Sequence, residues 1–120
     1  MAHHARAVLV VAALTATAAA LASCGSTPSA PPGEPVTLTA ELSDGDVTVP
    51  EEAPEVSRGT EVTLEITSDS PVEVHVHGFD RYIRLDEAGT GQATFTADIP
   101  GVFEIETHDT GLLIYRLAVR

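Results

Sequence analysis

From residue 36 onward, apolar and polar residues alternate with a period of two, and this pattern constrains the fold more than any other feature of the sequence. The clearest runs are 36–42, 60–67 and 72–77, in which every second residue is apolar. Successive side chains of a β-strand point to opposite faces of the sheet, so each run predicts a strand with one buried and one exposed face. No stretch of this region has the periodicity of an amphipathic helix.

Clusters of Gly, Pro, Asp and Ser separate these runs at turn-like intervals, at 43–45, 68–71, 88–91 and 109–111. Further strands are expected at 46–49, 81–85, 92–97, 102–108 and 112–119, with a loop at 50–59 that holds an edge strand near Val56. The spacing predicts an all-β fold, an antiparallel Greek-key β-sandwich of seven or eight strands that spans residues 36–120. The expected core comprises Val62, Leu64, Ile66, Val74, Val76, Phe95, Phe103, Ile105, Leu113, Tyr115, Leu117 and Val119.

The first 24 residues have the composition of a targeting segment. Arg6 precedes an apolar run of small residues at 7–22, which has the length of a short transmembrane helix but ends like an export signal. The end of this run, Leu21-Ala22-Ser23-Cys24, resembles the lipobox of bacterial lipoproteins. The resemblance implies a signal peptide at 1–23 and a lipid on Cys24 that holds the protein on the extracytoplasmic side of the cell membrane. An ordinary signal peptide that happens to contain a cysteine is the alternative.

Residues 24–35 connect this head to the alternating region and are rich in Pro, Ser and Gly. Such a composition has no apolar face to bury and is typical of a semi-extended tether.

The chain has 18 acidic residues against 6 Lys and Arg, which gives a net charge of −12. An excess of this size argues against nucleic acid as a partner, because binding to phosphates requires clustered basic residues. It equally argues against polybasic binding to anionic lipids, which leaves the lipid anchor as the expected membrane contact.

Three histidines outside the head suggest a metal site. His75 and His77 are two residues apart on an expected strand, so they share the face opposite the valines. His108 ends another expected strand, and the two groups converge if the strands are neighbours. Imidazole together with carboxylate suits Cu(II), zinc, nickel or Fe(II). The alternative is an ordinary half-exposed strand whose polar face happens to contain histidine. The candidate ligands are His75, His77 and His108, with Asp80, Glu106 and Asp109 as supporting groups.

Residues 60–120 resemble the C-terminal part of a cupredoxin, in particular the EfeO-type cupredoxin-like domains. The resemblance rests on the strand at 60–67, the histidine-bearing strand that follows it, and the segment Ala97-Asp98-Ile99-Pro100-Gly101-Val102-Phe103-Glu104-Ile105. In cupredoxins a Pro-Gly-x-aromatic strand leads into the copper loop. The resemblance implies that His75, or else His77, matches the first copper histidine and that His108 falls in the second ligand region.

The expected copper loop departs from the cupredoxin pattern of Cys, His and often Met, because it is Thr107-His108-Asp109-Thr110-Gly111. Type 1 copper requires a thiolate, and the chain's one cysteine is Cys24 at the end of the head. The sequence therefore argues against blue-copper electron transfer and against a soft Cu(I) site. A thiolate-free Cu(II) or zinc site remains.

Two functions fit the sequence, and neither is enzymatic. No serine or threonine lies in a recognisable nucleophile elbow, and the glutamates of the expected strands are typical solvated acids. Phe79 and Tyr82 are expected to cover one end of the sandwich. The first function is a membrane-anchored, metal-binding lipoprotein, and the second is an interaction or structural module that uses the sandwich as a scaffold.

Overall fold

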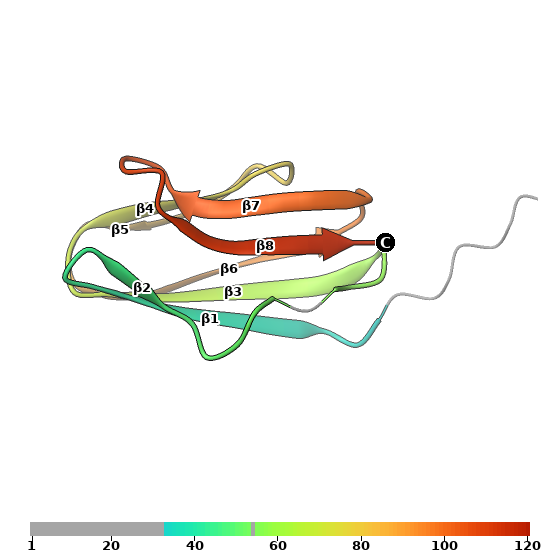
Figure 1. Cartoon of the computed structure of the whole chain (residues 1–120), viewed down its shortest axis with the longest axis horizontal. Coiled ribbons are helices and arrows are strands. Elements are labelled where there is room, and N and C mark those ends of the chain that lie inside the picture. The colour runs from blue at the N-terminus through green and yellow to red at the C-terminus, as the bar shows by residue number, and fades with distance from the viewer. Residues whose placement is uncertain (1–32, 54) are drawn as a thin grey trace, which may run out of the picture.

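The computed structural model describes residues 33–53 and 55–120, so the expected signal peptide, Cys24 and most of the expected tether lie outside the described residues. Two four-stranded sheets pack face to face (Figure 1). One sheet has the order β2-β1-β3-β6 and the other β5-β4-β7-β8, which confirms the predicted all-β sandwich. Within these residues no helix has the length and apolar character needed to cross a membrane. The strands are β1 Val36–Ser43, β2 Asp46–Thr48, β3 Thr60–Ser68, β4 Val72–Val76, β5 Arg81–Leu85, β6 Gly89–Ala97, β7 Gly101–Thr107 and β8 Leu113–Val119.

The pairing of β1 with β3 is parallel, which differs from the wholly antiparallel arrangement that the sequence predicts. Parallel neighbours need a crossover connection, and here β2 and the loop at 49–59 provide it. Val56 anchors this loop through a bridge to Val119 in the other sheet and is almost fully buried. The expected edge strand near Val56 is therefore a single bridge that ties the crossover to the core.

Strand β6 begins at Gly89, three residues earlier than expected, because β3 offers backbone partners along its whole length. Gly91 pairs with Ile66 in this extension, so the turn predicted at 88–91 is wrong. A Cβ atom on Gly91 would lie 2.9 Å from an Ile83 methyl group and 3.0 Å from one of Leu85. Glycine is needed here because side chains of β5 pack directly on the backbone, not because the chain turns.

The core lies between the sheets and includes ten of the twelve residues expected there. Leu113 was expected to be buried but is 37% exposed, and Ile114 is buried in its place. A register shift between Ile105 and Glu106 in the pairing of β7 with β8 explains this difference, since an irregularity of this kind inverts the alternation at the start of β8. Phe103 is only partly buried and packs against the edge of the core.

A buried phenol joins the two sheets. Tyr115 of β8 is 4% exposed, and its hydroxyl group donates a hydrogen bond to the backbone carbonyl of Thr39 in β1. Burial raises the pKa of this phenol above its usual value, so it stays neutral and remains a donor. The interaction therefore combines apolar burial with a polar contact across the sandwich.

We predict that Tyr115→Phe lowers the free energy of unfolding by about 1 kcal/mol, because the Thr39 carbonyl loses its donor inside the protein. Urea unfolding of residues 33–120 measures this change. Tyr82→Phe is the matched control, since Tyr82 is 47% exposed and its change should be much smaller. Equal loss in the two variants would contradict the bridging role of Tyr115.

A second set of polar contacts links two turns at the end of the sandwich. The Asp69 carboxylate accepts hydrogen bonds from the Asp44 backbone N–H and the Ser43 hydroxyl group. The Asp44–Gly45 turn between β1 and β2 has positive φ at both residues, as in a type I′ hairpin. The Asp44 N–H in particular lowers the pKa of Asp69, because it stabilises the charged form.

Since the folded-state pKa of Asp69 is depressed, its contribution to stability is present above the unfolded value of about 3.9 and is lost as pH falls through the folded value. We predict that Asp69→Asn lowers the thermal midpoint at pH 7 and that its difference from wild type shrinks near pH 2. Asp86→Asn, an exposed change in the β5–β6 loop, is the control. A difference for Asp69→Asn that does not vary with pH would contradict this role.

Candidate functional site

Strand β4 places its histidines by burying its valines. Val74 and Val76 are fully buried between the sheets, so His75 and the following His77 project from the opposite face. Burying each valine stabilises the fold by about 1.5–3 kcal/mol, which fixes the orientation of the strand. Strands β5 and β7 flank β4, with Tyr82 and Glu106 opposite His75 on the two sides. The condition that β4 and the strand before His108 are neighbours is therefore met.

His75 is the more enclosed of the two histidines, with 18% of its side chain exposed. Its ring stacks on that of Tyr82, with centroids 4.3 Å apart and planes only 8° from parallel. The Nε2 atom of His75 lies 3.9 Å from an Asp80 carboxylate oxygen. Asp80 belongs to the β4–β5 turn and has positive φ, and 88% of its side chain is exposed.

His77 is held by a carboxylate of the neighbouring strand. Its Nε2 atom lies 2.8 Å from Glu106 Oε1, and its ring centroid lies 4.4 Å from that of His75. Glu106 faces His75 in the strand register and bonds diagonally to His77, with 27% of its side chain exposed. We call this group of side chains the imidazole surface; it consists of His75, His77, Asp80, Tyr82 and Glu106.

The chemistry of the imidazole surface follows from the direction of the ring nitrogens. A neutral imidazole that donates Nε2–H to a carboxylate leaves the lone pair of Nδ1 available as an acceptor. Histidines that bind metals commonly donate their second ring N–H in this way, which fixes the tautomer and increases ligand basicity. The His77–Glu106 pair has the distance that this arrangement needs, whereas the 3.9 Å between His75 and Asp80 is too long for a hydrogen bond.

His108 is not in ring contact with the other histidines within the described residues. Its backbone N–H donates to the Glu73 carbonyl, and its ring centroid lies 6.5 Å from that of Tyr82. Asp109 follows it in the exposed β7–β8 loop. Among residues 33–53 and 55–120, no group of three or more His, Cys, Asp or Glu side chains is arranged to hold a metal ion. The structure thus brings together His75, His77 and Glu106 and leaves His108 and Asp109 at the edge.

Two other acidic side chains of this sheet are paired with arginine. Arg84 donates a hydrogen bond to the Glu73 carboxylate across β4 and β5, and this bond raises the pKa of Arg84. Glu104 binds Arg116 across β7 and β8. The carboxylates of Glu73 and Glu104 are thus paired with arginine, whereas that of Glu106 pairs with His77.

Tyr82 is the residue whose role the sequence did not indicate. It was expected to cover the end of the sandwich with Phe79, and that expectation is wrong because Tyr82 points outward onto His75. Phe79 does cover the core, where it packs against Phe95 and Phe103. The parity of β5 could have shown this, since Tyr82 precedes the buried Ile83 and must face the opposite side.

Comparison with solved structures gives the fold a wider context. One similar structure is a chain of a heme-copper terminal oxidase dimer, 19% identical with a TM-score of 0.58, over 73% of this chain and 66% of that one. Another is a copper binding protein in the apo form, 14% identical with a TM-score of 0.53, over 70% of this chain and 86% of that one. A third is the multicopper oxidase mgLAC, 16% identical with a TM-score of 0.50, over 72% of this chain and 38% of that one.

These likenesses show that the fold is cupredoxin-like. The chain spans just under two thirds of the oxidase chain and well under half of the multicopper oxidase. No family model matches the chain, and no curated protein matches it.

The residues present do not fit type 1 copper. The described segments contain neither cysteine nor methionine. In the β7–β8 loop, the buried Thr107 hydroxyl group accepts a hydrogen bond from the Leu112 backbone N–H and pairs with the Thr110 hydroxyl group. Hydroxyl groups therefore close the loop that the cupredoxin resemblance equates with the copper loop.

Proposed function

We propose that this chain is a lipid-anchored, extracytoplasmic cupredoxin-like module that binds Cu(II) at the His75–His77 pair and does not act in blue-copper electron transfer. The observation that supports this most is the pair of adjacent imidazoles with their Nε2 atoms turned toward Glu106 and Asp80. Such a pair offers two Nδ1 lone pairs on one face of a rigid strand. No catalytic step is assigned to it.

The donor set favours Cu(II) over softer ions. Imidazole nitrogens with carboxylate or water oxygens suit tetragonal Cu(II), whereas Cu(I) prefers thiolate or thioether ligands. Two protein nitrogens leave the remaining positions to water, so the bound ion would be open to exchange. The copper-related names of the similar structures support a copper-related role. Zinc has no such support and serves as the competing ion in the test.

We predict that residues 33–120 bind one equivalent of Cu(II) and that His75→Ala or His77→Ala weakens binding by roughly tenfold or more, because each removes one of two ligands. His108→Ala is the matched control and should retain most of the affinity. Isothermal titration calorimetry gives the affinities. The Cu(II) adduct should lack the intense visible band of a copper–thiolate bond.

Two outcomes would overturn the copper proposal. Cu(II) binding that survives loss of both His75 and His77 would locate the site elsewhere. No measurable binding would favour the second function, a protein-interaction or structural module. The finding that supports this second function is that no group of three ligands is arranged for a metal among the described residues.

Anchoring rests on the sequence Leu21-Ala22-Ser23-Cys24, which lies outside the described residues. We predict that cells fed a clickable fatty acid label the wild-type protein and that Cys24→Ala abolishes the label, because the thiol is the site of attachment. Ser26→Ala is the control and should remain labelled. Equal labelling of the Cys24→Ala variant would contradict lipid attachment.

A further inference from the structure

A cavity opens between the two sheets at the end of the sandwich where three turns meet. The turns are the β1–β2 hairpin, the β3–β4 turn and the β7–β8 loop, at the left end of the molecule in Figure 1. The cavity has a volume of about 280 Å³. None of the five residues of the imidazole surface lines it, so it is a separate feature.

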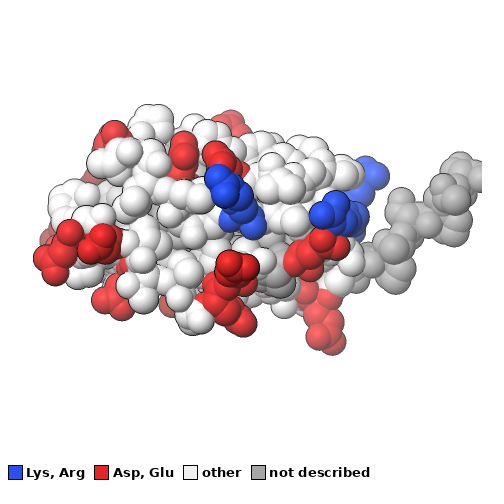
Figure 2. Space-filling model, viewed as in Figure 1, with Lys and Arg blue, Asp and Glu red and all other residues white. Residues whose placement is uncertain are grey.

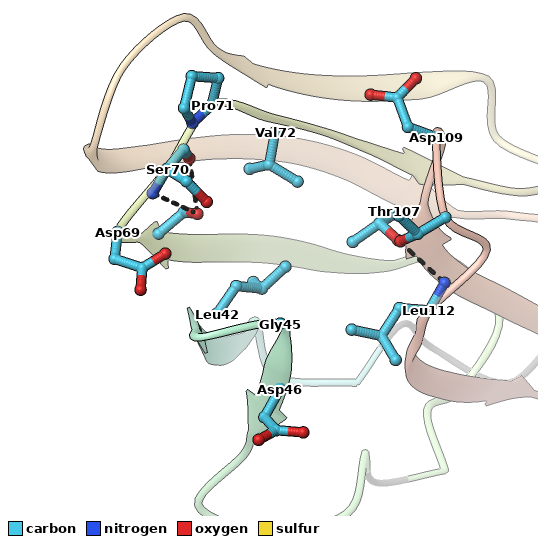
Figure 3. A pocket seen from close by; sticks show the side chains of 12 residues that line it. Leu42, Gly45, Asp46, Asp69, Ser70, Pro71, Val72, Thr107, Asp109 and Leu112 are labelled. Atoms are coloured by element: carbon cyan, nitrogen blue, oxygen red, sulfur yellow. Dashed lines mark hydrogen bonds between the residues drawn. The ribbon is translucent and has the colours of Figure 1, made fainter.

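The lining of the cavity is apolar in the middle and acidic at the rim. Leu42, Val72 and Leu112 surround its centre, and Figure 3 shows Asp46, Asp69 and Asp109 around them. Asp46 begins β2, whereas Asp69 and Asp109 belong to the β3–β4 turn and the β7–β8 loop. A site of this kind presents an apolar surface for the body of a ligand and negative charge for its polar end.

The polar groups of the lining are already satisfied except at the rim. The hydroxyl group of Ser68 donates to the Ser70 carbonyl, and the hydroxyl group of Thr107 is bonded within its own loop. Asp69 accepts hydrogen bonds from the β1–β2 turn and is held in its charged form. Across the described residues, no side-chain hydrogen bond or ion pair involves Asp46 or Asp109. The cavity therefore presents carboxylates and apolar surface to a ligand, and few hydrogen-bond donors.

The charge around the cavity selects the sign of the ligand. The net charge of the chain is −12, and the charged side chains visible at the left end of Figure 2, where the cavity opens, are acidic. Arg84, whose pKa the charge of Asp109 helps to raise, is bound to Glu73. An anion would be repelled by the carboxylates at the rim, whereas a cation would be attracted.

We propose that this cavity binds a small organic cation, an ammonium or guanidinium group on a short aliphatic stem. The stem would pack against Leu42, Val72 and Leu112, and the charged group would lie at the rim with Asp109 or Asp46. The volume is at the lower limit of ligand pockets, which span roughly 300–1,000 Å³, so a larger ligand would not be enclosed. A bare metal ion is a poor occupant, since no set of three ligands is arranged for one in the described segments.

The test uses the ¹⁵N-labelled protein and n-butylammonium as the probe, followed by amide chemical-shift mapping. We expect saturable shifts confined to residues 42–46, 68–72 and 107–112, with a dissociation constant in the millimolar range. Ammonium chloride has the charge without the stem, and n-butanol has the stem without the charge. Each should bind at least several-fold more weakly than n-butylammonium.

Variants separate the cavity from general attraction to an acidic protein. Asp109→Asn should weaken n-butylammonium binding several-fold. Glu61→Gln removes the same charge at the start of β3, the end of that strand far from the cavity, and should leave binding unchanged. Shifts spread over the whole acidic surface, or equal effects of the two variants, would overturn the proposal. So would the absence of saturable shifts.

Discussion

The two-residue period of β4 is the constraint on which the proposed metal site depends. Val74 and Val76 cannot leave the space between the sheets without a large loss of burial, so His75 and His77 are held on the outer face at a fixed spacing. The pairing of β4 with β5 and β7 then adds Tyr82 and Glu106 to that face. The imidazole surface is thus a consequence of how the core packs.

The fold and the chemistry of the site are separable in this chain. The sandwich has cupredoxin-like geometry, but hydroxyl contacts of Thr107 close the β7–β8 loop. The imidazoles instead lie on the outer face of the sheet, where His77 pairs with Glu106 and His75 stacks on Tyr82. This arrangement is consistent with the general observation that a fold supplies a scaffold and that function depends on the residues placed on it.

Local patterning was sufficient to predict most of the fold and to name every residue of the imidazole surface except Tyr82. Alternation identified the strands and the shared face of His75 and His77, because side-chain direction is a local property. Contacts that depend on strand register could not be predicted from local patterning. The irregularity that exposes Leu113 and buries Ile114, the parallel pairing of β1 with β3, and the diagonal bond from Glu106 to His77 all depend on how separate strands align. The separation of His108 from the other histidines likewise depends on how the strands align.

The central claim is that any metal bound by this domain lies on the outer face of β4. Paramagnetic Cu(II), added in substoichiometric amounts to ¹⁵N-labelled protein, broadens the amide signals nearest to the ion and so locates it directly. The account predicts that the signals of residues 74–78, 81–83 and 105–106 broaden first, while those of 109–111 remain sharp. Selective broadening of residues 107–111, with β4 and β5 unaffected, would place the metal in the β7–β8 loop and contradict the account.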